Sequence, residues 1–383
     1  MAKLAVTQLD VAQRLVLTRV DFNVPLEGER VVDNSRIVAT LPTLRNLMER
    51  GARSVLCSHL GRPKGRADER YSLRPLVARL EHLLEHSVGF CPETVGPLAE
   101  EMSARLQPGG LLLLENLRFH RGEEANDDGF ARQLAALGEA YVDDAFGAAH
   151  RAHASIVGVT KYFPQAAAGL LMQSELDYLG RLLQAQQHPF VVLLGGAKAS
   201  DKLPLLAHLA ARADEMLVGG GMAYTFLRAL GQETGDSLVQ EDAVEPIRKL
   251  LGQFPKGHFV LPIDHVLSTY EVVTTIPRHG KAMDIGPSTR ALFGEHIRRA
   301  RLLFWNGPMG VFEQPPLDAG TLAVARAVAD CPGTTVAGGG DSLSALRQAG
   351  LKDALTHVST GGGASLEFLA GNPLPGVEAL TEA

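Results

Sequence analysis

Short apolar runs recur along this chain, separated by longer segments in which apolar residues return at helical spacing. The runs are continuous rather than alternating, which is typical of parallel strands that are buried on both faces. The runs that we expect to form strands are Leu15–Val20, Ser54–Ser58, Leu111–Leu114, Ala140–Asp143, Phe190–Leu194, Glu215–Val218, His258–Leu261, Arg301–Trp305, Thr334–Ala337 and His357–Ser359. Regular alternation of strand and helix predicts an α/β fold with parallel sheets covered by helices on both faces.

The residues that directly follow these strands differ between the two halves of the chain. In the first half they are polar and basic: Arg19–Asn23, Ser58–Arg62, Glu115–Arg118 and Asp144–Arg151. In the second half most are glycine clusters: Gly195–Gly196, Gly219–Gly221, Gly338–Gly340 and Gly361–Gly363. Ligands of open parallel sheets bind beyond the carboxyl ends of the strands. We therefore predict two doubly wound, Rossmann-like domains with different ligands.

The segment from Pro164 to His188 is the natural connection between these domains. It contains an amphipathic, helix-like run of leucines: Leu170, Leu171, Leu176, Leu179, Leu182 and Leu183. We expect a hinge helix here, with the first domain spanning residues 1–168 and the second spanning residues 169–383.

One stretch, Gly195-Gly-Ala-Lys198-Ala-Ser-Asp-Lys202, carries two lysines near the expected start of a helix. Their spacing predicts that both lie on one helix face. Two cations there would repel each other and the positive end of the helix dipole. A phosphate between them would relieve this repulsion, and free N–H groups of the glycine turn would add to its binding. The alternative is a solvated turn that happens to contain lysines.

The first half gathers cations at its strand ends: Arg19, Arg36, His59, Arg62, Arg118 and Arg151. Arg36 follows Asp33–Ser35, a helix-start signature, and so belongs in a first helical turn. Arginine suits bidentate binding of phosphate or carboxylate, and the set predicts a pocket for a small polyanion. Each arginine alone could instead form a surface salt bridge. Asp21 and Asn23 could hydrogen-bond a hydroxylated substrate, or they could be turn residues ahead of Pro25.

The glycine-rich half lacks the standard nucleotide signatures, because neither G-x-x-x-x-G-K-[ST] nor G-x-G-x-x-G occurs. Asp341 follows Gly338–Gly340 and could hold Mg²⁺ together with ligand phosphates, or it could cap a helix. Glu313 could accept hydrogen bonds from ribose hydroxyls or simply face solvent. Gly361–Gly363 precede a helix start, which is suited to stabilising negative charge in a transition state.

Composition narrows the class of protein. The chain has 383 residues, a formal net charge of −6 and no basic tail, which makes nucleic acid a poor candidate ligand. Three widely spaced cysteines favour a reducing compartment. No signal-peptide core or membrane-length apolar run occurs, so we expect a cytosolic protein. His150 and His153 are not predicted to bind metal, because no third ligand is spaced to complete the site.

An anion pocket in one half, a phosphate-binding site in the other and a connecting hinge are the components of a phosphoryl-transfer enzyme. With these residues identified, the chain resembles the phosphoglycerate kinase family from near Leu15 to the C-terminus. The stretches that carry the resemblance are Arg19–Pro25, Ser58–Pro63, Glu115–Phe119, Ala149–Ser155, Gly195–Lys202, Gly219–Phe226, Trp305–Glu313, Gly338–Ser342 and Ser359–Ser365.

The resemblance implies reversible phosphoryl transfer from 1,3-bisphosphoglycerate to ADP, giving 3-phosphoglycerate and ATP. It implies a glycolytic phosphotransferase with a carboxyl group as acceptor, Mg²⁺ as cofactor, hinge closure and in-line transfer without a covalent enzyme intermediate. It also implies a cytoplasmic monomer whose tail, from about residue 366, packs on the first domain. Its substrates are small molecules, with no membrane or nucleic-acid partner.

Carried over position by position, the resemblance assigns roles to individual residues. The phosphoglycerate site would be Asp21, Asn23, Arg36, His59, Arg62, Arg118 and Arg151. The catalytic set would be Arg36, Lys198, Lys202, Gly361 and Gly362, with Lys198 following the transferred group. The nucleotide site would be Lys198, Lys202, Gly219, Gly220, Glu313, Gly339, Gly340, Asp341 and Ser342, with Asp341 as the metal ligand.

Two other classes of protein remain as alternatives. One is another two-domain enzyme such as a dehydrogenase, against which the missing G-x-G-x-x-G motif argues. The other is a catalytically silent nucleotide-binding protein on the same fold, which would have no need of Arg36, Lys198, Lys202 and Asp341 together.

Overall fold

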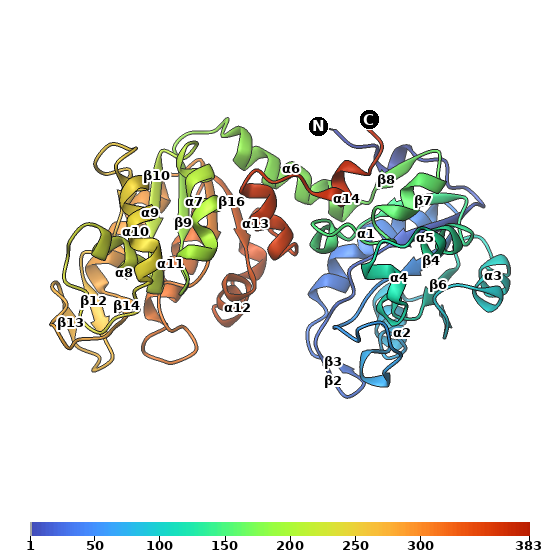
Figure 1. Cartoon of the computed structure of the whole chain (residues 1–383), viewed down its shortest axis with the longest axis horizontal. Helices are drawn as coiled ribbons and strands as arrows, with labels where there is room; N and C mark the ends of the chain where they lie inside the picture. The colour runs from blue at the N-terminus through green and yellow to red at the C-terminus, as the bar shows by residue number, and fades with distance from the viewer. Residues whose placement is uncertain (1) are drawn as a thin grey trace. The chain divides into compact units, whose positions relative to one another are not determined.

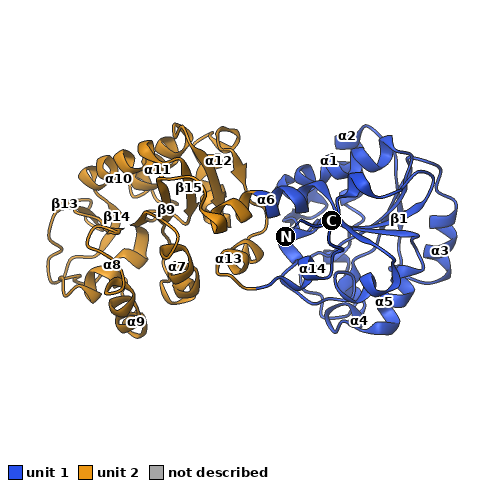
Figure 2. Ribbon diagram, turned by 90° about the horizontal axis from the view of Figure 1, so that it is seen from above, with its two compact units in different colours: residues 1–177, 373–383 blue, residues 178–372 orange. Residues whose placement is uncertain are grey.

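The computed structural model describes residues 2–383, and this chain divides into two compact units. Unit 1 contains the residues up to Asp177 together with Pro373–Ala383, and unit 2 is Tyr178–Asn372 (Figure 2). Each unit is an α/β structure built on one six-stranded parallel sheet (Figure 1). The predicted fold class, two doubly wound parallel-sheet domains, is confirmed.

The sheet of unit 1 has the strand order β5-β6-β4-β1-β7-β8, and every neighbouring pair is parallel. The strands are β1 (Leu15–Arg19), β4 (Arg53–Cys57), β5 (Val88–Cys91), β6 (Leu111–Leu114), β7 (Ala140–Asp143) and β8 (Ala166–Ala168). The helices are α1 (Ser35–Glu49), α2 (Leu76–Leu84), α3 (Pro97–Ala104), α4 (Arg121–Glu124), α5 (Asp128–Ala135) and α14 (Pro375–Glu378). Helices α1 and α2 lie on one side of the sheet, and α4, α5 and α14 lie on the other (Figure 2). A two-residue hairpin, β2 (Leu26–Glu27) and β3 (Arg30–Val31), precedes α1.

The main sheet of unit 2 has the parallel order β11-β10-β9-β15-β16-β17. Its strands are β9 (Phe190–Leu194), β10 (Glu215–Val218), β11 (Phe259–Val260), β15 (Leu302–Asn306), β16 (Thr334–Gly338) and β17 (His357–Val358). Its helices are α7 (Leu203–Ala210), α8 (Gly220–Ala229), α9 (Glu241–Leu251), α10 (Pro287–Arg299), α11 (Ala319–Ala329), α12 (Gly340–Gln348) and α13 (Gly363–Leu369). Helices α10, α11 and α12 cover one face, and α7, α8, α9 and α13 cover the other (Figure 2).

The cores explain why the apolar runs are continuous. Strands β9 and β15 are buried at every position, and Trp305 of β15 is fully buried. It belongs to a cluster that also contains Val191 from the neighbouring strand and Phe293 and Val324 from the covering helices. Burial on both faces removes the in–out alternation that a one-sided sheet would show.

The predicted strands are all present, and the structure adds others that the apolar pattern did not reveal. β5 is interrupted by Gly89, and β8 consists of three alanines, so neither has a strong strand signal. Unit 2 also contains a small antiparallel sheet of β12 (His265–Leu267), β13 (Val272–Val273) and β14 (Ala282–Ile285). Such short strands are set by tertiary pairing rather than by local sequence.

The expected connecting helix is α6, which spans Leu170–Gln184. Its first turn is held by unit 1, because Asp144 Oδ1 accepts hydrogen bonds from the backbone N–H groups of Leu171 (2.9 Å) and Met172 (3.1 Å). The division between units falls after Asp177, inside this helix, rather than before it at residue 168. The helix is therefore shared between the units.

The C-terminal segment packs on unit 1. Lys3 and Glu382 form an antiparallel bridge, and Thr381 N–H donates to Ala166 O at 2.9 Å. The returning segment begins at Pro373, later than the resemblance implies, because α13 belongs to unit 2. None of the helices within residues 2–383 has the length and apolar composition needed to cross a bilayer.

Candidate active site

The carboxyl-terminal edge of the unit 1 sheet collects the polar segments that the sequence singled out. β1 lies between β4 and β7, and all three strands run in the same direction. The segments Arg19–Asn23, Ser58–Arg62 and Asp144–Arg151 therefore leave the sheet side by side, at the edge where ligands of such sheets bind.

Hydrogen bonds tie four of the expected site residues into one surface. Arg36, the second residue of α1 as predicted, donates from Nη1 to Asp21 Oδ2 at 2.8 Å. Asn23 Oδ1 accepts from the backbone N–H of Gly61 at 3.0 Å, and Arg118 Nη1 donates to the carbonyl of Gly61 at 2.6 Å. The loops after β1, β4 and β6 are thus fixed to one another.

Behind this surface, the buried side chains of Arg19, Ser155 and Glu123 form a hydrogen-bonded chain that we call the framework. Arg19 is fully buried, its Nε donates to Ser155 Oγ at 2.8 Å, and that hydroxyl donates to Glu123 Oε1 at 2.6 Å. Glu123 is also fully buried. Arg19, which the sequence placed among the strand-end cations, therefore serves the framework and not the exposed surface.

His59 takes its protonation state from this framework. Arg19 Nη2 lies 3.0 Å from His59 Nδ1, and because a guanidinium can only donate, Nδ1 must be the acceptor. Burial, followed by the charge of Arg19, lowers the pKa of His59 well below its ordinary value. His59 is therefore a neutral ring whose Nε2–H is available to a ligand.

The basic side chains at this edge carry more positive charge than their acidic neighbours neutralise. Arg62 is exposed and makes no hydrogen bond or ion pair within the part of the chain that the structure describes. Burial, and then the charge of Arg151, lower the pKa of Arg118 to about 10. The carboxylate of Glu124 lies 3.3 Å from Arg118 Nε and offsets this only in part. An anion bound here would relieve the repulsion among these cations.

In unit 2 the two lysines differ from the sequence expectation. Lys198 lies in the turn before any helix, and its side chain is 70% exposed, with Nζ 3.9 Å from Asp201 Oδ2. Lys202 turns inward, and its Nζ donates to the carbonyl of Gly195 at 2.7 Å. The prediction that both lie on one helix face is wrong, because a tight turn and a single 3₁₀ turn precede α7.

The backbone amides of this glycine turn also form hydrogen bonds within the protein. Gly195 N–H donates to Asn306 O (2.9 Å) and Gly196 N–H donates to Pro308 O (2.8 Å), so neither is a free anion donor. Lys202 is the inward-facing cation at this edge. Burial lowers its pKa to about 8, while the charge of Asp341 acts in the opposite direction. A bound phosphate would favour the charged form of Lys202.

Two cavities open at the carboxyl edge of the unit 2 sheet. The larger, about 580 Å³, has a mainly apolar wall that includes Leu238, Val311 and Phe312, with Glu313 and Asp341 at polar positions. The smaller, about 270 Å³, is lined by Lys202, Asn306, Gly307, Gly339, Gly340, Asp341, Ser342, Gly362, Gly363 and Leu366. Asp341 belongs to both walls. An apolar recess next to a glycine- and lysine-lined recess suits a ligand with a flat ring and a phosphate tail.

The glycines let the backbone segments around these cavities approach closely. A Cβ on Gly220, whose φ is +62°, would lie 2.6 Å from both Gly196 N and Pro308 O. Gly219 and Gly220 pack against the 308–309 segment, and it is Gly221 that lines the larger cavity. Gly361 N–H donates to Ser359 Oγ at 3.2 Å, while Gly362, with φ of +54°, reaches the smaller cavity.

The metal candidate is a single carboxylate. Among residues 2–383 no group of three or more His, Cys, Asp or Glu side chains could hold a metal ion. Asp341 is exposed and stands between the two cavities. One carboxylate beside the glycine- and lysine-lined recess fits Mg²⁺, which takes one or two carboxylates and otherwise uses water and substrate phosphates.

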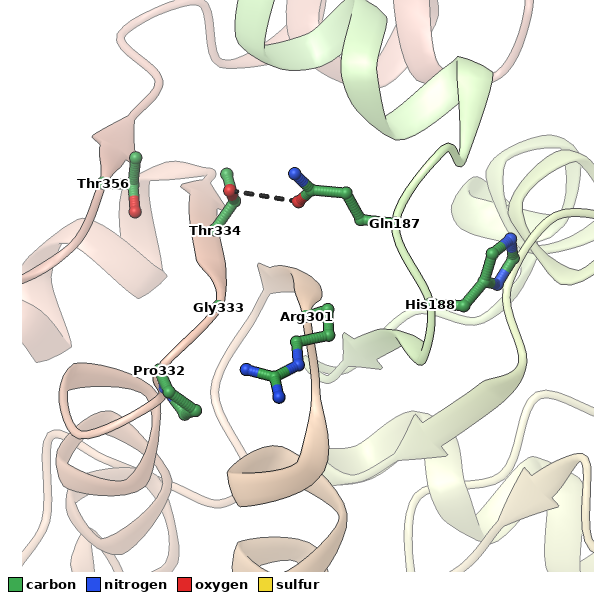
Figure 3. A pocket seen from close by; sticks show the side chains of 7 residues that line it. All are labelled: Gln187, His188, Arg301, Pro332, Gly333, Thr334 and Thr356. Carbon is green, nitrogen blue, oxygen red and sulfur yellow. Dashed lines mark hydrogen bonds between the residues drawn. The ribbon is translucent and has the colours of Figure 1, made fainter.

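A further cavity of about 470 Å³ lies at the opposite end of the unit 2 strands (Figure 3). It is lined by Gln187, His188, Arg301, Pro332, Gly333, Thr334 and Thr356, all at or before the amino ends of β9, β15, β16 and β17. Thr334 Oγ1 is 3.3 Å from Gln187 Oε1 across its wall. This edge does not carry the residues that the sequence singled out.

Sequence reasoning missed the apolar wall of the larger cavity. Tyr224, Leu238, Val239 and Met283 come from α8, from the segment before α9 and from β14. They do not directly follow strands of the main sheet, and although Tyr224 lies within the stretch Gly219–Phe226, nothing in the sequence marked any of the four as a cavity residue. Only the packing of the small antiparallel sheet against α8 brings them together.

Comparisons with known proteins point to one family. The family model described as phosphoglycerate kinase matches residues 6–372. Curated phosphoglycerate kinases from Acidobacterium capsulatum and Moorella thermoacetica are each 51% identical, over the full length of both chains. The solved phosphoglycerate kinases of Coxiella burnetii (35% identity, TM-score 0.90) and Pyrococcus horikoshii (31% identity, TM-score 0.86) each match over 98% of both chains. On the evidence of sequence and fold together, the chain belongs to the phosphoglycerate kinase family.

Proposed function

We propose that this chain catalyses reversible phosphoryl transfer between 1,3-bisphosphoglycerate and ADP, giving 3-phosphoglycerate and ATP. The observation that carries the proposal is the pairing of two different ligand edges in one chain. Unit 1 presents cations in excess of their partners, and unit 2 presents an apolar recess beside a lysine- and glycine-lined one. A small phosphorylated acid matches the first edge, and a nucleotide matches the second.

In unit 1, Arg62, Arg118 and Arg151 would bind the phosphate and carboxylate of phosphoglycerate. Asp21 and Asn23 would contact its hydroxyl, and His59 would donate from its neutral Nε2–H. Arg36 would lie at the reacting carboxyl group. Its hydrogen bond to Asp21 gives it a fixed direction before the ligand arrives.

In unit 2, the larger cavity would hold the adenine ring and ribose, with Glu313 accepting from ribose hydroxyls and Gly219 and Gly220 behind the adenine wall. The smaller cavity would hold the phosphates, bound by Lys202, Gly339, Gly340 and Ser342. The Ser342 hydroxyl already accepts from Gly307 N–H at 2.7 Å, so its own proton remains free to donate. Asp341 would be the protein ligand of Mg²⁺, which supplies charge neutralisation on the phosphates when bound.

In the direction of ATP use, a carboxylate oxygen of 3-phosphoglycerate forms a bond to the γ-phosphorus as the bond to the bridging β,γ-oxygen breaks. No proton is transferred and no residue is phosphorylated. Lys198, which is exposed on its turn, would follow the transferred group, and Arg36, Gly361 and Gly362 would stabilise its charge. We propose that α6 is the hinge whose bending brings the two ligands together and excludes water.

The same proposal includes the acceptor group, the pathway, the location and the partners of the enzyme. The acceptor is a carboxyl group, and the enzyme acts in glycolysis and gluconeogenesis as a cytoplasmic monomer. It has small-molecule substrates and no nucleic-acid or membrane partner.

The test is ADP formation from Mg·ATP with and without 3-phosphoglycerate. Glyceraldehyde-phosphate dehydrogenase and NADH remove the acyl phosphate, because its formation is uphill. We expect turnover that needs both 3-phosphoglycerate and Mg²⁺. Nucleotide binding without turnover would indicate a silent relative instead, and binding of NAD(H) in the larger cavity would indicate a dehydrogenase.

A further inference from the structure

The turn that carries Lys198 and Lys202 is held by a residue from a distant part of unit 2. Gln240 Oε1 accepts hydrogen bonds from the backbone N–H of Ala199 and from that of Ser200, the latter at 3.0 Å. Gln240 Nε2 donates to Ser200 Oγ at 2.9 Å. One side-chain amide therefore satisfies three polar groups lying between the two lysines.

The position of Gln240 in its own helix does not explain these contacts. It is the residue before the first turn of α9, where a side chain normally accepts from its own helix. The Gln240 side chain makes no such bond. Its backbone N–H is anchored to Thr225 Oγ1 of α8 at 3.2 Å, and Thr225 is fully buried. Gln240 thus connects a rigid helix to the lysine turn.

The segment leading to Gln240 also forms a wall of the larger cavity. Asp236, Ser237, Leu238 and Val239 line that cavity, together with Gly196 and Ala197 from the lysine turn. A ligand in the cavity would therefore contact the support of the turn as well as the turn itself. Among residues 2–383, the one further restraint on the Lys198 side chain is a long ion pair to Asp201.

We propose that Gln240 is a positioning residue for phosphoryl transfer, and that its amide fixes the turn from which Lys198 and Lys202 reach the transferred group. This inference rests on the proposed function, which gives those lysines their roles. It assigns to Gln240 a part in the rate of transfer and none in the binding of phosphoglycerate. Because a displacement of about 1 Å in a reacting group can cost about 100-fold in rate, a loosened turn should slow the reaction measurably.

The experiment compares Gln240→Met, which keeps the length of the side chain without its hydrogen bonds, with Gln240→Glu, which keeps both acceptor contacts to the amides. Exposed Gln253, just beyond α9, is the matched control as Gln253→Met. Hydrogen exchange of the Ala199 and Ser200 amides, kcat, and KM for 3-phosphoglycerate are measured for each. Thermal unfolding verifies that every variant is folded.

For Gln240→Met we expect faster exchange at both amides and a kcat lowered about tenfold, with KM for 3-phosphoglycerate within about twofold. Gln240→Glu should restore slow exchange and keep kcat within about threefold, and Gln253→Met should change nothing. Unchanged exchange or unchanged kcat in Gln240→Met, with normal turnover by the unsubstituted chain, would overturn the role of Gln240 alone. No turnover by the unsubstituted chain would overturn the proposed function and this role together.

Discussion

The two ligand edges lie at equivalent places in two similar sheets, yet they are built in opposite ways. The edge of unit 1 is made of polar and charged side chains held by other polar and charged side chains, as in the path from His59 through Arg19 and Ser155 to Glu123. The edge of unit 2 is made of backbone, and its glycines let the segments after β9, β10 and β15 come within van der Waals contact. Its main cation, Lys202, bonds to a carbonyl.

The difference shows two ways of building the proposed phosphate sites. Arginines that must point in fixed directions need partners that hold them, and burying those partners costs desolvation free energy. Backbone amides and carbonyls are already fixed by the fold, so unit 2 needs few charges. We therefore expect the loss of a buried supporting cation to damage the stability of unit 1 and the loss of a lysine to damage the catalysis of unit 2, and the first predictions below test this contrast.

The largest effect is expected for Arg19→Leu, which removes the buried guanidinium that Ser155 links to the Glu123 carboxylate and leaves that carboxylate with His153, 3.7 Å away, as its basic neighbour. Breaking such a buried charge network typically costs about 3–5 kcal/mol of unfolding free energy. Urea unfolding followed by circular dichroism should show an earlier transition. Fluorescence of Trp305, the only tryptophan and a core residue of unit 2, should keep its midpoint.

The counterpart in unit 2 is Lys202→Met. Burial already disfavours the Lys202 charge, so removing it should leave the unfolding free energy of unit 2 unchanged or raised. Equal destabilisation by both substitutions would contradict the contrast between the two edges.

The next largest effect is expected for Lys198→Ala. Loss of a group that stabilises developing charge should lower kcat by about 100- to 1,000-fold. The dissociation constant for Mg·ADP, measured by calorimetry, should change little, because the exposed Lys198 is not in the wall of either cavity. Exposed Lys256→Ala in the same unit is the control. An unchanged kcat would rule out this role for Lys198.

A smaller effect concerns Asp144 at the start of α6. Burial, with a contribution from the Asp143 charge, raises the pKa of Asp144 to about 8. The folded state therefore keeps a proton that the unfolded state loses above its ordinary pKa near 3.8, and stability falls as the pH rises from about 4 to about 8. Asp144→Asn should remove this slope and be more stable than the parent at pH 8. Parallel pH profiles of the two proteins, from urea midpoints, would contradict this assignment.

The smallest effect is expected for Arg62→Ala. Arg62 is exposed and makes no hydrogen bond or ion pair with another described residue, so its loss should raise KM for 3-phosphoglycerate about tenfold, equivalent to about 1.4 kcal/mol. KM for ATP should be unaffected, and Arg66→Ala, exposed in the same loop, should change neither value. Equal changes in both KM values would contradict the division of substrates between the units.

Much of the fold could be predicted from the sequence, because strands buried on both faces appear in it as continuous apolar runs. The strand-end rule then indicated which segments lie at the ligand edges, and the structure brings Asp21, Asn23, Arg36 and Arg118 into one hydrogen-bonded surface. The prediction from local spacing was wrong at the lysine turn, because it extended the helical periodicity of α7 back to Lys198. The turn conformation is set by contacts with the 306–308 segment and Gln240, which no local pattern records.

The sequence by itself thus determined the sheets, the connecting helix and the chemical character of each edge, since these depend on burial patterns and residue types near in the chain. Tertiary structure alone decided that Arg19 turns inward, that His59 is neutral, that the apolar cavity wall comes from α8 and β14, and that Gln240 holds the lysine turn. Each of these rests on contacts between residues far apart in sequence, which the fold makes only after the sheets have assembled.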